Sequence, residues 1–219
     1  MEINESQFLK IVDMQVQMAL WECCHPTFIE EVLHNKYYKN LIDEIFSDAV
    51  AFSHKDPASK NHILSILQNY TSFKAVTHYR VSNFIYKNLE NSEKEFFALF
   101  ISNRGKLLSG ADIHFKAEIG QDFVLDHGYG TVIGETSKIG DGCYFLGGII
   151  LGANGIANND LSKRHPNIGN NVEIGAFSRI FGNVSIGNNV FIGSNCVIVE
   201  DIPSDSKVVS RSYNQITRH

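Results

Sequence analysis

The chain has 219 residues, of which 43% are hydrophobic and 20% charged, and its formal net charge at pH 7 is −5. This length is enough for one or two globular domains with a buried core. No run of Lys or Arg is visible, which argues against a nucleic-acid-binding protein, because that class carries clustered basic residues.

The sequence also argues against a membrane protein and a metalloprotein. The opening MEINESQFLKIVDM has an acidic second residue and no long apolar run, so a signal peptide is not expected. The most apolar stretch, residues 144–156, is too short and too rich in Gly to span a bilayer. The four cysteines show no CxxC spacing and no pattern typical of a metal site; they are Cys23, Cys24, Cys143 and Cys196. We therefore expect a cytoplasmic protein with reduced thiols, no bound metal and no membrane contact.

Residues 1–108 are predicted to form an α-helical domain. Apolar residues recur at helical spacing over residues 8–19, again after Pro26 and again over residues 41–50. Pro26 suits the first turn of a helix because its φ is already close to the helical value. Helical spacing resumes at residue 63 and continues to the end of this region.

Two local signals divide the helical region, and a third marks its end. Asp56 and Pro57 predict the start of another helical segment, because Asp caps helices and Pro fits a first turn. A break is expected near Asn91. Gly105 is the only glycine before Gly110, after which glycines are frequent. This change in composition predicts a domain boundary.

Between residues 167 and 203 one apolar residue recurs at every sixth position. A period of six fits neither a helix nor a single strand. It is the hexapeptide signature of a parallel β-helix, in which each short strand contributes one inward aliphatic side chain before a corner. Three strands make one triangular coil, so each marker is predicted to stack on the one eighteen residues later. The markers are Ile168, Ile174, Ile180, Ile186, Ile192 and Ile198.

Six-residue spacing also holds earlier in the chain. It runs from Ile113 to Leu125 and, after a slip of two residues within residues 126–130, from Ile133 to Leu151. We therefore predict an α-helical domain followed by a left-handed parallel β-helix over residues 109–203, with a separate tail over residues 204–219.

The second break in the repeat is larger. From Leu151 to Ile168 the chain takes seventeen residues where six are expected, so eleven residues must leave the coil as a loop within residues 153–166. Insertions in a solenoid collect on one face and often carry its binding site. The chemistry of the protein is therefore expected at the two breaks.

Ionisable residues do gather at both breaks. Asp126 and His127 lie at the first break, and Arg164 and His165 lie at the second break. Asp112 belongs to the same set, although it precedes the first break by most of one coil. Such a set meets the needs of general-base catalysis: an imidazole accepts a proton near neutral pH, and a carboxylate on its other nitrogen fixes its tautomer. No Ser or Cys lies in a nucleophile elbow, so a covalent enzyme intermediate is not expected.

Three stretches, in this order, resemble the serine O-acetyltransferases of cysteine biosynthesis: GADIHFKAEIG, VLDHGYGTVIGET and, at the end of the loop, KRHPNIG. The likeness covers roughly residues 55–203, and its motifs are far more specific than the hexapeptides. The resemblance implies a left-handed β-helix that assembles as a homotrimer or a dimer of trimers, with the α-helical domain of residues 1–108 serving oligomerisation. It also implies transfer of acetyl from acetyl-CoA to the hydroxyl of L-serine, at a site between neighbouring subunits.

The same resemblance assigns roles to individual residues. His127 matches the general base of the family, and Asp112, in the motif DIH, matches the carboxylate that orients this base. Asp126 matches the residue that holds the ammonium group of the substrate. Asp56, in KDPAS, resembles a second such carboxylate, contributed by the helical domain.

On the other side of the substrate, Arg164 and His165 match the pair that engages its carboxylate. An amino acid carries one cation and one anion, so acidic and basic partners on opposite sides of the hydroxyl agree with this assignment. For CoA, the resemblance implies contacts with backbone amides near Ala153 and Ala176 and with a basic group, Arg179.

Departures from the family keep other hypotheses open. The family's Gly-Gly-Thr-Gly is replaced by GANG at residues 152–155, and the longer loop has Lys163 where an acidic residue is usual. The second hypothesis is therefore an O-acetyltransferase of the same mechanism that acts on another small hydroxylated acceptor. The third is a non-catalytic hexapeptide scaffold. The chain ends at residues 216–219 in ITRH rather than in a terminal Ile, which argues against docking into the sulfhydrylase of the pathway.

Overall fold

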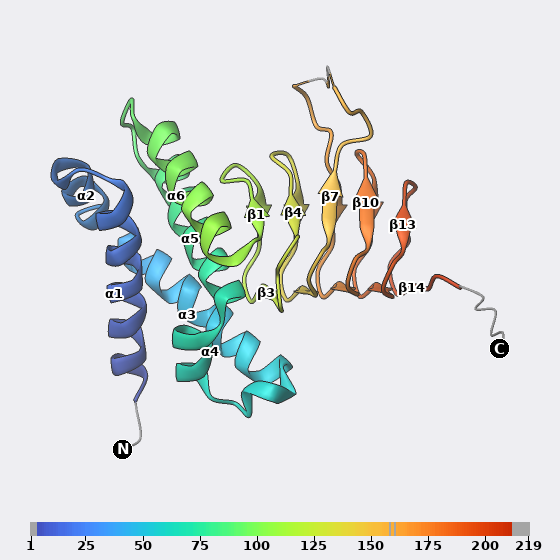
Figure 1. The fold of residues 1–219 in the computed structure, drawn as a ribbon, viewed down its shortest axis with the longest axis horizontal. Helices are drawn as coiled ribbons and strands as arrows, with labels where there is room; N and C mark the ends of the chain where they lie inside the picture. Colours follow the sequence, from blue (N-terminus) through green and yellow to red (C-terminus); the bar gives the residue numbers. More distant parts are fainter. Residues whose placement is uncertain (1–3, 158, 160, 212–219) are drawn as a thin grey trace, which may run out of the picture.

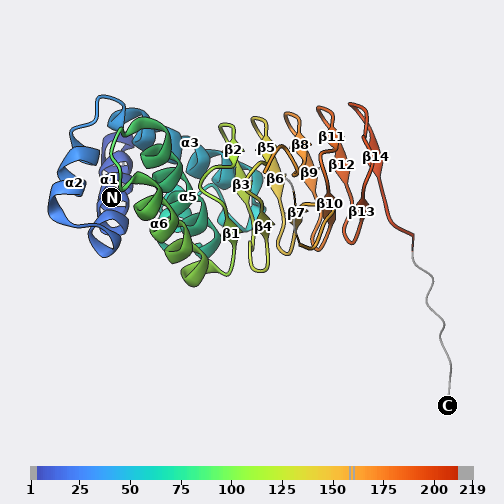
Figure 2. The same ribbon diagram turned by 90° about the horizontal axis from the view of Figure 1, so that it is seen from above.

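The computed structural model describes residues 4–157, 159 and 161–211, and in them a helical region is followed by a long prism of short strands (Figures 1 and 2). The helices are α1 (Glu5–Cys23), α2 (Pro26–Leu33), α3 (Tyr38–Lys55), α4 (Ile63–Asn69), α5 (Thr71–Asn88) and α6 (Lys94–Ser109), with a 3₁₀ turn, η1 (Pro57–Ser59). Residues 212–219, which include the chain ending considered for sulfhydrylase docking, lie outside the described residues.

The helix boundaries follow local signals in the sequence. Asn4 caps α1 through a reciprocal capping box with Gln7, and Pro26 occupies the first turn of α2 as predicted. Asp56 also caps a helical segment, since its side chain accepts a backbone hydrogen bond at the start of η1. This segment is a single 3₁₀ turn, because the next residue, Lys60, takes the left-handed conformation with φ of 52°.

The remaining helices differ from the prediction at one point. The break expected near Asn91 is confirmed, because α5 and α6 are separated there. An unpredicted break at Tyr70 separates α4 from α5. The last helix ends at Gly110, which has φ of 74° and so closes the helix in the left-handed conformation that glycine adopts most readily.

The strands of the prism contain two or three residues each and form three parallel sheets, which we name A, B and C. Sheet A contains β1 (Asp112–Ile113), β4 (Val132–Ile133), β7 (Ile150–Gly152), β10 (Arg179–Phe181) and β13 (Val197–Ile198). Sheet B contains β2 (Glu118–Ile119), β5 (Lys138–Ile139), β8 (Asn167–Ile168) and β11 (Ser185–Ile186). Sheet C contains β3 (Val124–Leu125), β6 (Tyr144–Phe145), β9 (Glu173–Ile174), β12 (Phe191–Ile192) and β14 (Lys207–Val208). The chain visits sheets A, B and C in turn, which is the path of the predicted left-handed parallel β-helix.

The register of the strands confirms the predicted stacks. The stacked pairs are Ile168 with Ile186, Ile174 with Ile192, and Ile180 with Ile198. All six side chains are buried, so the hexapeptide markers form the apolar core of the prism. The coil also continues past residue 203, because β14 pairs with β12.

The two breaks in the repeat lie at two different edges of the prism. Residues 126–131 occupy the edge where sheet C turns into sheet A, which we call the C–A edge. Residues 153–166 leave the edge where sheet A turns into sheet B, which we call the A–B edge. The loop stands out from the end of β7 in Figure 1, and β7 still pairs directly with β10, the next strand of sheet A.

Helix α5 closes the open end of the prism. The first coil has no strand beyond it, so its carbonyl groups need other partners. Arg80 donates to the carbonyl oxygen of Ile119 at 2.7 Å, and Asn83 donates to that of Ala117 at 3.0 Å. Arg80 is itself held by buried Asp48 of α3, with 2.9 Å between Nε and Oδ2. These bonds fix the helical region against the coil that precedes the first break.

Among the described residues, no helix is long and apolar enough to cross a membrane. The four cysteines are free thiols; Cys24 is half-buried and the other three are buried.

Candidate active site

The C–A edge, the start of η1 and the junction of α4 and α5 line an acidic cavity of about 410 Å³. Its lining comes from the helical region and from the first break in the repeat: Asp56, Ala58, Asn69, Tyr70, Thr71, Ser72, Asp126 and His127. The structure thus brings together three residues that were predicted from the sequence, Asp56, Asp126 and His127, although the first is far from the other two along the chain.

His127 is presented to the surface by a corner that differs from the others of the prism. Corners such as those at Asn171 and Asn189 have one residue with positive φ, whereas here His127, Gly128 and Gly130 have φ of 61°, 67° and 76°. The side chain of His127 is 80% exposed, whereas that of Asp126 is only 14% exposed. His127 Nε2 lies 3.6 Å from Asp126 Oδ2. The imidazole therefore has a carboxylate beside it and most of its surface open to a further partner.

Each carboxylate of this cavity accepts a hydrogen bond from a tyrosine. The Tyr70 hydroxyl donates to Asp56 Oδ2 at 2.9 Å, and the Tyr144 hydroxyl donates to Asp126 Oδ2 at 3.0 Å. Asp56 Oδ1 accepts the backbone N–H of Ala58 at 2.8 Å. Within the described part of the chain, neither carboxylate forms an ion pair with Lys or Arg. The cavity therefore presents two negative groups that suit an ammonium group.

A second cluster lies at the A–B edge, where the inserted loop returns to the prism. Arg164 forms an ion pair with Glu135, and this bond lowers the pKa of the Glu135 carboxyl. Thr136 Oγ1 accepts the backbone N–H groups of Arg164 at 3.0 Å and of His165 at 3.1 Å. Lys163 donates to the carbonyl oxygen of Thr136. Thr136 thus anchors the end of the loop on the preceding coil.

His165 is buried in this cluster, and its hydrogen bonds fix its tautomer. Its Nδ1 accepts the backbone N–H of Thr136 at 3.2 Å, so the proton of the neutral ring is on Nε2. Burial, and next the charge of Arg164, lowers the pKa of His165 to about 4. The ring packs on Gly134, where a Cβ would stand 2.2 Å from Nε2. The predicted pair therefore consists of one cation, Arg164, and one neutral N–H donor.

Asp112 has a different partner from the one expected. Its Oδ2 accepts a hydrogen bond from Lys106 Nζ at 2.7 Å, and the described contacts of one chain include none between Asp112 and His127. Burial lowers the pKa of His114, and the charges of Glu135 and Asp112 oppose this shift. The charge of Asp112 therefore acts on His114, which follows β1.

The three residues predicted to contact CoA lie at three separate places. Ala153 follows β7 at the A–B edge, whereas Ala176 lies at the C–A edge between β9 and β10. Arg179 is exposed at the start of β10, on the outer face of sheet A. One chain does not bring them together.

Sheet A separates the two clusters. All its strands run from the C–A edge to the A–B edge, so His127 and Arg164 lie at opposite edges of one sheet (Figure 1). Strand residues advance about 3.3 Å each, so two or three of them with their corners span about 10 Å or more. One small amino acid cannot contact both clusters of the same chain.

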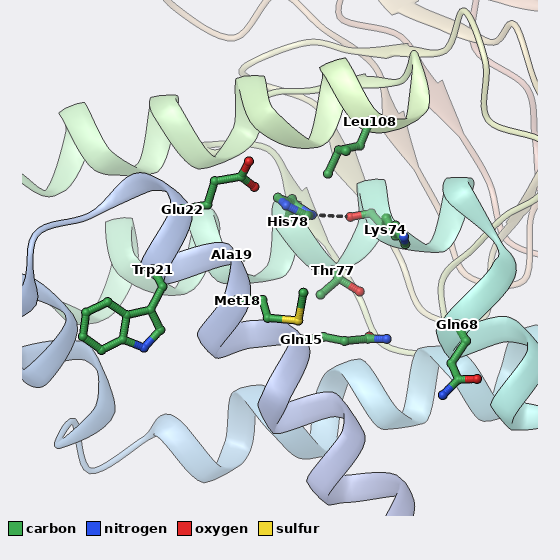
Figure 3. A pocket seen from close by; sticks show the side chains of 10 residues that line it. All are labelled: Gln15, Met18, Ala19, Trp21, Glu22, Gln68, Lys74, Thr77, His78 and Leu108. Atoms are coloured by element: carbon green, nitrogen blue, oxygen red, sulfur yellow. Dashed lines mark hydrogen bonds between the residues drawn. The ribbon is translucent and has the colours of Figure 1, made fainter.

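A larger cavity, of about 660 Å³, lies in the helical region and contains none of the predicted site residues. Figure 3 shows its lining: Gln15, Met18, Ala19, Trp21, Glu22, Gln68, Lys74, Thr77, His78 and Leu108. Several of its polar groups already have protein partners: His78 Nδ1 lies 2.7 Å from the Lys74 carbonyl oxygen, and Glu22 pairs with Arg104. We therefore place the chemistry at the two edges of sheet A. No group of three or more His, Cys, Asp or Glu in the described ranges is arranged to hold a metal ion.

Sequence reasoning did not assign roles to four residues of the two clusters: Tyr70, Tyr144, Glu135 and Thr136. Glu135 and Thr136 belong to the GET of the motif at the first break, so a sequence signal for them was present. Tyr70 and Tyr144 lie outside any motif, and only their contacts with the two carboxylates reveal them.

Comparison with known proteins finds similarity both in the repeats and over most of the chain. Residues 165–200 match a family described as Bacterial transferase hexapeptide (six repeats). A serine acetyltransferase of Synechococcus elongatus is 39% identical over 155 residues, which cover 71% of this chain and 60% of that protein. A serine acetyltransferase of Staphylococcus aureus strain MSSA476 is 36% identical over 169 residues, which cover 77% of this chain and 75% of that protein. The chain therefore spans less than two thirds of the first relative and three quarters of the second.

The structural similarity extends over both regions of the molecule. The crystal structure of Neisseria gonorrhoeae serine acetyltransferase in complex with serine matches this fold with a TM-score of 0.77 at 28% identity. The match covers 96% of this chain and 83% of that one.

Proposed function

Because this chain belongs to the serine acetyltransferase family, we propose that it transfers the acetyl group of acetyl-CoA to the hydroxyl oxygen of L-serine. One observation carries the proposal beyond family membership. The chain builds a pair of carboxylates without a cation at one edge of sheet A, and an Arg–His pair at the other. These are the complementary partners of the ammonium and carboxylate groups of a free amino acid.

The acidic pair and the Arg–His pair of one site come together when several copies associate, and we call them its acidic half and its basic half. If sheet A of three copies faces a common threefold axis, the C–A edge of each copy lies beside the A–B edge of the next. The outer face of sheet A suits such burial, because Val132 and Val197 are 37% and 60% exposed in the single chain. Helix α6 adds further exposed apolar side chains, Phe96, Leu99 and Phe100. We therefore propose a homotrimer with three sites, each formed between two subunits.

In this arrangement serine lies between the two clusters. Asp56 and Asp126 of one subunit hold its ammonium group, while Arg164 and His165 of the next subunit hold its carboxylate. Arg164 contributes charge, and His165 contributes the N–H of a neutral ring. The serine hydroxyl then faces His127, whose exposed imidazole lies beside the ammonium site.

Acetyl transfer follows by direct attack. The imidazole of His127 accepts the hydroxyl proton as the serine oxygen attacks the thioester carbonyl carbon. Collapse of the tetrahedral intermediate breaks the carbon–sulfur bond and leaves the acetyl group on serine. The imidazolium returns its proton to the departing thiolate of CoA. By the resemblance, Asp112 would orient this imidazole, which requires that it exchange its bond with Lys106 for one with His127.

CoA would reach this site along the boundary between the two subunits. Ala153 and Ala176 lie at the two edges that meet in the trimer, and Arg179 lies on the sheet between them. The residues predicted for CoA are thus dispersed in one chain and come together between two chains. Their assignment rests on this placement and on the resemblance.

A second acceptor remains the competing hypothesis because of the loop. Lys163, which replaces the usual acidic residue, is bound to the carbonyl oxygens of Thr136 and Pro166 beside Arg164, and burial lowers its pKa to about 8. An additional basic group at this edge favours an acceptor with more negative charge than serine.

A thiol-release assay with a panel of acceptors tests the proposal. We expect L-serine to be acetylated, while ethanolamine, which lacks the carboxylate, and 3-hydroxypropionate, which lacks the amino group, are poor acceptors. Turnover of 3-hydroxypropionate without turnover of L-serine would overturn the serine assignment. Failure of every acceptor to release CoA would favour the scaffold hypothesis.

A further inference from the structure

We propose that Tyr70 and Tyr144 are positioning residues that set the affinity for the amino group of the acceptor, by holding the two carboxylates of the acidic cavity. This inference rests on the proposed function, because it concerns the ammonium site of the same reaction. Neither tyrosine belongs to the motifs that identify the family in this sequence.

The first argument is the convergence of two unrelated elements on equivalent atoms. Tyr70 comes from the junction of α4 and α5, whereas Tyr144 is the first residue of β6. Their hydroxyls donate to Asp56 Oδ2 and Asp126 Oδ2 at 2.9 and 3.0 Å. Both side chains are half-buried, so each phenol ring is held by packing while its hydroxyl bonds a carboxylate that lines the cavity.

The second argument is electrostatic. The hydrogen bond with Asp56 is the main cause that raises the pKa of Tyr70, and the charge of Asp126 raises it further. Burial is the main cause that raises the pKa of Tyr144, and the charges of Asp126 and Asp56 add to it. The four groups therefore share one electrostatic field. Both shifts favour the protonated hydroxyl, which is the donor form.

The third argument is that a neutral donor is what this cavity requires. Two neighbouring carboxylates repel each other and are costly to hold in place without partners. A Lys or Arg partner would stabilise them but would occupy the position of the substrate's ammonium group. A tyrosine hydroxyl fixes one carboxylate oxygen and leaves the negative charge available. Asp126 Oδ1 has no hydrogen-bond donor among the described residues, so it remains free for the ligand.

The chain offers a matched control for removal of one such hydroxyl. Tyr38 donates to Asp13 Oδ1 at 2.6 Å in the helical region, and both side chains are half-buried. Tyr38→Phe therefore removes the same type of bond away from the cavity. It should change neither the KM for L-serine nor the kcat.

The experiment compares the kinetics of Tyr144→Phe, Tyr70→Phe and Tyr38→Phe with those of the parent protein. A hydrogen bond to a charged group is lost in the first two, so we expect the KM for L-serine to rise by about tenfold. The KM for acetyl-CoA and the melting temperature should stay at the parent values. A KM for L-serine within about twofold of the parent value in both variants, well below that range, would overturn the inference.

A double-mutant cycle shows whether Tyr144 acts through Asp126. Asp126→Asn alone should raise the KM for L-serine, and adding Tyr144→Phe to it should raise the KM much less than Tyr144→Phe does in the parent. Independent, multiplicative effects would show that Tyr144 does not act through this carboxylate, and would overturn its positioning role.

Calorimetric titration with L-serine in the absence of acetyl-CoA separates this inference from the proposed function. A parent protein that binds L-serine but does not acetylate it would overturn the proposed function, while the loss of affinity in Tyr144→Phe would still support the positioning role. Equal affinity of parent and variant would overturn the positioning role alone. A parent that does not bind L-serine would overturn both.

Discussion

The two edges of sheet A are built from the same repeating coil but carry opposite chemistry. At the C–A edge, two extra residues turn His127 outward beside Asp126. At the A–B edge, the inserted loop returns through Arg164 and buried His165, both tied to Thr136 of the preceding coil. The hexapeptide repeat supplies a rigid scaffold, and the reactive groups occur where the repeat is interrupted.

The comparison also explains why one chain is incomplete. The acidic edge is open, with the His127 side chain 80% exposed, whereas the basic edge is already ordered by hydrogen bonds. A stiff sheet keeps the two edges apart, so no local rearrangement joins them. An intersubunit site follows from this geometry, and the variants below test each edge separately, from the largest expected effect to the smallest.

The largest effect is expected at the acidic edge. His127→Ala removes the proton acceptor, and general-base assistance contributes about 10²- to 10⁴-fold, so kcat should fall by about that factor. The fold should survive, because the side chain lies outside the stack of Ile residues. Steady-state kinetics measures kcat, and circular dichroism on the same preparation measures whether the fold is retained. A folded variant that retains about a third of the parent kcat, far above that range, would remove His127 from the mechanism.

The sheet between the edges is tested by a charge on its outer face. Val132→Asp would bury an unpaired carboxylate in the proposed trimer, because its neighbours on the outer face of sheet A are Asp112 and Ile150, at a cost of about 3–5 kcal/mol per interface. We expect light scattering to show dissociation, with activity lost in parallel. Ser185→Asp is the control, because Ser185 occupies the equivalent outward position on sheet B. If the sheet A variant and Ser185→Asp have the same oligomeric state and the same activity, sheet A is not the interface.

A smaller effect is expected at the basic edge. Arg164→Ala removes a charged contact with the substrate but no proton acceptor, so the KM for L-serine should rise about 10- to 100-fold with a smaller change in kcat. The rise in KM distinguishes Arg164→Ala from His127→Ala, whose effect lies mainly in kcat. An Arg164→Ala variant with an unchanged KM for L-serine would exclude Arg164 from the binding site.

The smallest effect concerns the buried ring at the basic edge. The pKa of His165 is lowered to about 4 in the folded chain, so between that value and about 6.5 the unfolded chain binds a proton that the folded chain does not. Stability should therefore fall as the pH is lowered. The contribution of His165 between pH 7 and pH 5 is about 1–2 kcal/mol. Urea unfolding at both pH values should show that His165→Asn loses less stability than the parent by this amount. An equal loss in both proteins would contradict the assignment of a buried neutral ring.

The fold was largely predictable from the sequence, for a physical reason. Each coil is a local structure, so a spacing of six residues fixes the direction of every side chain. Three such spacings make one coil, so Ile180 pairs with Ile198, which lies eighteen residues later. The helical region was less predictable. The break at Tyr70 has no glycine or proline to announce it, and it depends on packing between elements.

The candidate site was predictable only in part. The motifs identified His127 and Arg164, because interruptions of a regular pattern are visible in sequence. They did not show that Asp112 pairs with Lys106 in one chain, nor that the two tyrosines hold the carboxylates. Such contacts join elements that are distant along the chain, and periodicity carries no information about them.

The central claim is that each site takes its acidic half from one subunit and its basic half from the next. Complementation tests it most directly. His127→Ala chains are mixed with chains carrying Arg164→Ala and His165→Ala, unfolded together and refolded, and the activity is compared with that of each parent variant alone. If subunits assemble at random in threefold rings, about a quarter of the interfaces regain both intact halves, and activity should rise toward that fraction of the unmutated level. Activity no higher than the average of the two separate variants would contradict the account, because it would mean that both halves of each site come from the same chain.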